Sequence, residues 1–314
     1  MKIQMTDING REYEVKDITQ IIFTETVGAA CASLCFKFKS REKIGEIVSV
    51  RAHSEKSIIF NGFCDCQRVT ADSKGFETYI YARSSASVLV DSQSRPFTFN
   101  CPSARQLWTE YARDLGFEHE LPEISCNEKY EVSSGTSCFG AINNFVSALT
   151  GCEIIITPEN KISLGEVSKD VKSLNGYTIL SASAVINRSE PVGEICFKRE
   201  QDTDYKAHFV SQLAREKGLG RTRYINLNSV AQWQRTNTVA QKMKGFFDDY
   251  MLLEITVDGT VNEKLYQRFS YSGEIGSYRD YILAEKRYIF DKGTEKTKLV
   301  LRKNIDMGEA VYVD

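Results

Sequence analysis

Alternation of apolar and polar residues is the feature that most constrains how this chain can fold. Leu34, Phe36 and Phe38 alternate with a cysteine and two lysines, which is the pattern of a strand with one buried face. Similar short patterns fill residues 1–96, with a turn sequence at 72–75. A chain of this kind folds into antiparallel sheets, so we expect a β-rich protein built from small barrels or sandwiches.

The periodicity changes to that of helices in residues 97–172. Apolar side chains recur every four residues from Leu107, which predicts a helix that stops at Gly116. A second helix is expected from a candidate N-cap at Ser137 to Gly151, followed by a hairpin. This stretch therefore predicts a small α/β domain.

Strand patterns return after residue 173, with one helix expected over residues 236–249 and Thr238 as its candidate cap. The polar stretch 202–220 fits either a helix or a long loop, and the last dozen residues are expected to form a tail. The predicted class is α+β and β-rich. The predicted domains are a first β-barrel domain at 1–96, the α/β domain at 97–172 and a second β-barrel domain at 173–314.

Charge and hydropathy narrow the classes of function. The chain has 40 Lys and Arg against 42 Asp and Glu, a net charge of −2. This balance argues against a general nucleic-acid binder. The chain has no apolar run of about 18 residues and no apolar stretch at its start, so we expect neither a membrane span nor a signal peptide. Nine cysteines without an export signal are expected to be reduced thiols in a cytosol.

The cysteines and histidines do not show the spacing of a metal site. Cys31 and Cys35 are four apart and Cys64 and Cys66 two apart, and neither pair forms the Cys-x-x-Cys of structural zinc. The three histidines are dispersed in polar stretches and are expected to be solvated at the surface: His53, His119 and His208. We therefore expect no metal and no cofactor, while a Cys/His nucleophile pair stays formally open.

Catalytic motifs are equally absent from the sequence. It contains no Gly-x-Ser-x-Gly, His-Glu-x-x-His or phosphate-loop pattern. An acidic loop could supply the paired carboxylates of a glycosidase, although a solubilising role is favoured for its members: Glu118, Glu120, Glu123 and Glu128. No catalytic residue is assigned, and the chain is expected not to be an enzyme.

Aromatic residues interleave with arginines towards the end of the chain. The set comprises Trp233, Tyr266, Tyr271, Tyr278, Tyr281 and Tyr288 with Arg268, Arg279 and Arg287. Such a set can stack nucleic-acid bases, but it is also typical of barrel strands and protein interfaces. The near-neutral charge favours the second interpretation.

Two stretches carry a resemblance to a known family. Residues 57–100 contain a strand with a Phe-x-Gly turn at 60–62, a hairpin and an aromatic-x-Arg-Ser element at 81–84, followed by the helix SARQLWTEYARDLGF. Residues 273–278 read Gly-x-Ile-Gly-x-Tyr, and a Thr-x-Leu-x-Leu strand closes at 297–301. This succession resembles the baseplate hub proteins of contractile-tailed phages, such as the Mu-type tail protein. It also resembles the hubs of PBSX-like prophages and of phage-tail-like bacteriocins.

The chain also departs from that family. It reads Asn262-Glu263-Lys264 where many relatives have a proline-glycine approach to the last barrel, and residues 202–229 have no counterpart.

The resemblance implies a homotrimer in which each subunit supplies two tube-like β-barrel domains with the small α/β domain between them. The ring would join the hexameric tail tube to the central spike protein and contact other baseplate proteins. It would assemble in the bacterial cytoplasm as part of a virion or phage-tail-like particle. DNA could pass through it without specific binding, and we expect an acidic lumen. The candidate interface residues are Phe36, Phe38, Ile275, Tyr278, Tyr281 and Tyr288.

Two other functions stay open at this point. One is a cell-wall (peptidoglycan) hydrolase associated with the tail tip. The other is a carbohydrate-binding or nucleic-acid-binding component that uses the small α/β domain.

Overall fold

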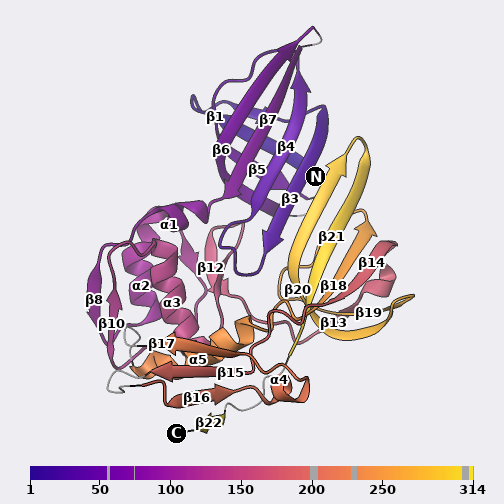
Figure 1. Ribbon diagram of the computed structural model, residues 1–314. Coiled ribbons are helices and arrows are strands. Elements are labelled where there is room, and N and C mark those ends of the chain that lie inside the picture. Colours follow the sequence, from indigo (N-terminus) through magenta and orange to yellow (C-terminus); the bar gives the residue numbers. More distant parts are fainter. Residues whose placement is uncertain (55–56, 74, 199–203, 228–231, 306–310, 314) are drawn as a thin grey trace.

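The structure is a computed structural model that describes residues 1–54, 57–73, 75–198, 204–227, 232–305 and 311–313. Strands dominate it, and most belong to one large, mainly antiparallel sheet (Figure 1). A small α/β unit and a separate four-stranded sheet lie beside the large sheet. The predicted β-rich α+β class is confirmed.

The first half of the large sheet comes from residues 2–84. In spatial order its strands run β3-β4-β7-β6-β5-β1-β2. Their bounds are β1 Lys2–Asp7, β2 Glu12–Glu14, β3 Ile18–Thr26, β4 Ser33–Ser40, β5 Ile47–His53, β6 Ile58–Asp72 and β7 Gly75–Ser84. The alternating side chains bury one face, with Phe36 and Phe60 at the centre of its core.

The second half follows the same logic near the other end of the chain. Its path runs β14-β18-β21-β20, with β19 beside β20 and β13 beside β19. The bounds are β13 Val171–Ser173, β14 Ile179–Ile186, β18 Met251–Asp258, β19 Arg268–Gly273, β20 Gly276–Asp291 and β21 Thr294–Lys303. The 3₁₀ turn η2, Leu174–Gly176, adds Leu174 to a second core around Leu283 and Leu299.

One long strand joins the two halves. Strand β20 pairs with β21 from Tyr281 to Asp291 and also with β3, from Glu285 opposite Thr26 to Asp291 opposite Gln20. Lys286 on β20 forms an ion pair with Glu25 on β3 at 2.8 Å, and its side chain is only 10% exposed. The described strands therefore form one open path from β14 to β2, where the sequence led us to expect two separate closed barrels.

Two helices and the β11–β12 hairpin of the α/β unit match the sequence prediction, whereas α1 was not predicted. Its elements are α1 Ser87–Asp91, β8 Phe97–Asn100, α2 Ala104–Tyr111, η1 Arg113–Leu115, β9 Glu118–His119, β10 Lys129–Val132, α3 Cys138–Thr150, β11 Ile154–Ile156 and β12 Lys161–Leu164. The N-cap side chains of Ser103 and Ser137 accept backbone N–H groups, and Gly116 and Gly151 end their turns at φ 87° and 74°. The first helix is shorter than predicted, because a 3₁₀ turn replaces its last residues.

The four-stranded sheet was not foreseen. Its order is β17-β15-β16-β22, and α5 packs on one face through Val239 and Met243. The bounds are β15 Glu194–Lys198, β16 Ala207–Val210, α4 Gln212–Glu216, β17 Thr222–Asn226, α5 Gln232–Gly245 and β22 Val311–Val313.

This sheet corrects three sequence predictions. The described part of 202–220 is neither one helix nor a long loop, because it contains β16 and α4. Part of the expected tail, residues 311–313, pairs with β16. Thr238 lies inside α5 and does not cap it.

All nine cysteines are free thiols, as expected. No helix in the described ranges is long and apolar enough to cross a bilayer.

Candidate functional site

The most exposed apolar edge of the large sheet is strand β14. It is the last strand of the path, and in the part of the chain that is described it pairs only with β18. Its side chains Leu180, Val185 and Ile186 are 53%, 37% and 62% exposed. An unpaired strand edge with apolar side chains is a surface to which another chain can add.

Small residues on β14 leave the core beneath it thinly covered. Ala182 and Ala184 lie opposite Ile255 and Leu253 on β18, both of which are buried in the second core. Ala184 itself is exposed. The edge therefore offers backbone hydrogen-bonding groups and an apolar surface at the same place.

The other end of the sheet is built differently. Strand β2 has three residues, two of them glutamates. Its Tyr13 hydroxyl donates to Asp7 Oδ2 at 2.9 Å. Short, charged edge strands resist pairing with other chains. The two ends of one sheet thus differ in their capacity for assembly.

The β19–β20 hairpin carries a ladder of tyrosines. The ring centroids of Tyr271 and Tyr278 are 6.3 Å apart, and those of Tyr278 and Tyr281 are 5.9 Å apart. The Tyr278 hydroxyl donates to the carbonyl of Ile275 at 2.9 Å. A Cβ on Gly273 would lie 2.1 Å from the Tyr271 hydroxyl oxygen, so the ladder requires glycine there. The motif at 273–278 therefore fixes the hairpin tip.

The structure separates the six candidate interface residues into two groups. Phe36, Phe38, Tyr281 and Tyr288 are 1%, 3%, 3% and 4% exposed and lie in the cores of the single chain. Their alternation turns them inward, where they have almost no surface for a partner. Ile275 is 36% exposed, and Tyr278 is half-buried beside it. The hairpin tip is thus the part of the set that a partner can reach.

The short motifs at 60–62 and 81–84 have structural roles. The guanidinium of Arg83 forms ion pairs with Asp65 at 2.5 Å and Asp91 at 2.7 Å, which ties β7 to β6 and α1. Gly62 lies inside β6, so the predicted turn is wrong. A Cβ on Gly62 would lie 2.0 Å from the Arg83 carbonyl oxygen. Glycine is needed because two backbones approach closely, not because the chain turns.

Two glutamates of the predicted acidic loop form ion pairs with the same lysine. Glu118 and Glu120 both contact Lys161 Nζ, at 3.8 and 2.9 Å, and the hydrogen bond that Lys161 donates to Glu120 raises the pKa of that lysine. A glycosidase needs two carboxyl groups facing each other across a sugar. These two instead share one cation at an exposed surface, which fits the favoured solubilising role.

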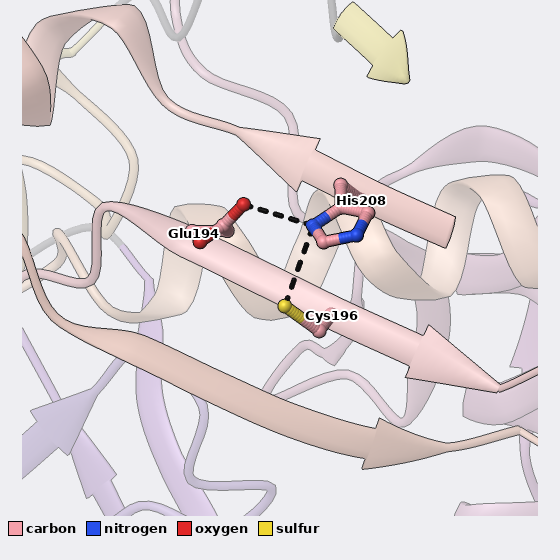
Figure 2. Close-up of side chains that lie close together, drawn as sticks. All are labelled: Glu194, Cys196 and His208. Carbon is pink, nitrogen blue, oxygen red and sulfur yellow. Dashed lines mark hydrogen bonds and ion pairs between the residues drawn. The ribbon is translucent and has the colours of Figure 1, made fainter. Parts of the chain in front are cut away.

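The histidines differ from the sequence prediction. His53, His119 and His208 are half-buried, so the prediction of solvated surface histidines is wrong. The His119 ring lies 4.4 Å from the ring of Trp108. His208 meets two side chains of β15, Glu194 and Cys196 (Figure 2). Sequence spacing missed this group, because it depends on how β15 and β16 pair.

Comparison with known proteins identifies the fold. No family model and no curated protein matches the chain. The 43 kDa tail protein of prophage MuSo2 from Shewanella oneidensis is similar at a TM-score of 0.77 and 12% identity, over 96% of this chain and 98% of that one. A tail protein from Neisseria meningitidis MC58 gives 0.76 and 15%, over 96% of each chain.

A third solved structure belongs to a secretion machine. The E. coli c3393 component of the type VI secretion system gives a TM-score of 0.60 at 8% identity, over 94% of this chain and 76% of that one. It is described as structurally similar to the T4 bacteriophage tail proteins gp27 and gp5. At these identities the likeness is one of fold, and it extends over nearly the whole chain.

Proposed function

We propose that this protein is the baseplate hub of a contractile phage tail or phage-like tail, a trimeric adaptor between the hexameric tail tube and the central spike. The observation that carries the proposal is the likeness of fold, over 96% of the chain, to tail proteins of two bacteria. The likeness to a secretion-system component that itself resembles T4 tail proteins supports a place at the junction of tube and spike. The role is structural and requires no catalytic site.

The arrangement of the large sheet suits a symmetry adaptor. Each chain has two β-rich lobes with separate cores, one from residues 2–84 and one from the second half of the sheet. Three copies therefore present six lobes, which can match a six-fold tube on one face. A trimer retains three-fold symmetry for the spike on the other.

The surfaces described above supply the contacts of the proposal. The β14 edge is the proposed subunit interface, because it combines free strand backbone with exposed Leu180 and Ile186. The hairpin tip at Ile275 and Tyr278 is the proposed contact to a second subunit or to a tail protein. A net charge of −2 is compatible with a ring around DNA that does not bind it specifically.

The mass of the purified protein in solution tests the proposal. We expect light scattering after size exclusion to give three times the chain mass of 35.6 kDa, alone or with the spike protein of the same gene cluster. Electron microscopy of the complex is expected to show a ring on the spike axis. A chain that stays monomeric with and without the spike protein would contradict the hub.

A further inference from the structure

Three side chains with metal-binding atoms converge on the outer face of the four-stranded sheet. Glu194 and Cys196 are two residues apart on β15 and therefore lie on the same face, and Cys196 is the cross-strand partner of His208 on β16. The opposite face, with Ile195 and Phe197, packs into the core against α5. Figure 2 shows the three side chains pointing toward one another.

Their separations are close to those in a tetrahedral zinc site. His208 Nδ1 lies 2.9 Å from Glu194 Oε1 and 3.5 Å from Cys196 Sγ, and the three ligand atoms lie within 4.8 Å of one another. Zinc bonds of about 2.0–2.3 Å at tetrahedral angles place such atoms roughly 3.4–3.6 Å apart. Binding of an ion would require His208 Nδ1 and Glu194 Oε1 to separate by about half an ångström.

The contacts are those of a ligand set rather than a catalytic relay. In a nucleophile–base–carboxylate triad the imidazole uses one nitrogen for the nucleophile and the other for the carboxylate. Here Cys196 and Glu194 both contact Nδ1 of His208. Three possible metal-binding atoms within 4.8 Å of one another fit a ligand set better than a relay.

The site is buried at one end and open to solvent at the other. Cys196 is 3% exposed and lies at the bottom, whereas the side chains of Glu194 and His208 are 31% and 35% exposed. An ion can therefore arrive from solvent and keep water as a fourth ligand. Zinc would replace the proton of the Cys196 thiol on binding.

A neighbouring strand orients the carboxylate. The Thr222 hydroxyl on β17 donates to Glu194 Oε2 at 3.3 Å, which leaves Oε1 facing His208. Partners of this kind hold metal ligands in position and raise affinity. The face thus has both the ligands and one supporting hydrogen bond.

We propose that Glu194, Cys196 and His208 bind one zinc-class divalent ion, which fastens β15 to β16. A thiol, an imidazole and a carboxylate suit zinc, whereas magnesium and calcium prefer oxygen ligands only. This proposal differs from the sequence-based expectation of a chain without a metal. It does not depend on the hub function, because binding can be measured on the chain in any oligomeric state.

Zinc competition on the full chain tests the site. Protein stripped with a chelator is titrated with Zn²⁺ against a chromophoric chelator, and bound metal is counted by elemental analysis. We expect one tightly bound zinc per chain. Cys196→Ser, His208→Gln and Glu194→Gln should each weaken it by more than the roughly 10–100-fold that loss of a supporting residue costs, and Thr222→Val should fall within that range.

Matched controls separate the site from the other thiols. Cys66→Ser and Cys101→Ser alter exposed cysteines outside the site and should leave zinc affinity unchanged. Cobalt in the wild-type chain should give the thiolate charge-transfer and tetrahedral ligand-field bands. The cobalt spectrum is measured on the wild-type chain, so it does not depend on whether any variant folds. Glu194→Gln changes a partly exposed side chain and should therefore leave the fold intact. The proposal is overturned by zinc affinity that survives His208→Gln and Glu194→Gln, by equal losses in the controls, or by cobalt spectra without these bands.

Discussion

At the scale of single residues, Asp7 shows how one carboxylate organises the turn between β1 and β2. It accepts the backbone N–H groups of Asn9 and Arg11, each at 2.9 Å, and the hydroxyl of Tyr13. The hydrogen bond from the Arg11 backbone is the main cause that lowers the pKa of Asp7, and burial opposes it. The ionised form is therefore the one that the fold prefers.

Replacing Asp7 should make the stability of the fold depend less strongly on pH in the acidic range. Because its folded pKa is lowered, its contribution is complete above its usual value of 3.8 and is lost as pH falls through the lowered pKa. We expect Asp7→Asn to melt at a lower temperature than wild type at pH 7, with the gap closing in strong acid. Thermal unfolding followed by circular dichroism across pH measures this, with Glu12→Gln on exposed β2 as control. A gap that is constant with pH would contradict the assignment.

Phe36 distinguishes a core residue from an interface residue. It is 1% exposed and stacks on Phe38 with ring centroids 6.0 Å apart. We expect Phe36→Ala to lower the free energy of unfolding by about 3–5 kcal/mol, the cost of a buried aromatic side chain. Urea unfolding should give the same loss at low and high protein concentration, since Phe36 is buried within the single chain. Phe63→Ala, at a 40% exposed position on β6, is the control with a small effect.

At the scale of elements, local signals were enough to predict helices α2 and α3 of the α/β unit. Their caps and stops, Ser103, Ser137, Gly116 and Gly151, act within one turn of the chain. The spacing of inward residues on β4 was predicted for the same reason. Strand β16 and helix α4 were not, because four-residue and five-residue elements leave too few positions for a period to show.

The candidate sites were harder to predict than the elements that carry them. Alternation indicates that Phe36 and Tyr281 share a face with their strand neighbours, but it does not say whether that face meets a core or a partner. The group around His208 requires Cys196 to lie opposite it, a register fixed only when β15 and β16 pair. Glu194 and Cys196, two residues apart in the sequence, were the available signal.

Strand β14 should behave as an assembly edge. Leu180→Lys with Ile186→Lys places two charges on side chains that are 53% and 62% exposed. The chain should fold with little change in melting temperature, while sedimentation velocity should show fewer oligomers than for wild type. Ile8→Lys, at a 63% exposed apolar position outside β14, is the matched control and should not affect the oligomer. An unchanged oligomer in the double variant would remove β14 from the interface.

At the scale of the whole molecule, the sequence predicted β-rich, α/β and β-rich blocks but not how the strands of the first and last blocks join. Strand β20 is sixteen residues long, and its pairing with β3 brings together segments from opposite ends of the chain. No local pattern encodes such a pairing. In the sequence, Lys286 and Glu25 look like ordinary surface charges. The strand register places them together in a largely buried ion pair.

The shared strand should make the two β lobes unfold together. Tyr288 on β20 belongs to the first core, and Leu283 on the same strand belongs to the second. Opening either lobe therefore disturbs β20 and the other core. Hydrogen exchange with increasing denaturant should give the same opening free energy for the slowest amides of β4 and β18. A β18 that opens well before β4 would show that the lobes are independent.

The pairing of β20 with β3 also determines how the chain carries load. The two strands lie antiparallel over seven residue pairs, from Glu285 opposite Thr26 to Asp291 opposite Gln20. A pull along the strand direction strains all their hydrogen bonds in shear at once, whereas a hairpin pulled apart at its end loses them one at a time. The pairing therefore couples the two lobes mechanically. A force along the strand direction on one lobe is transmitted directly to the other.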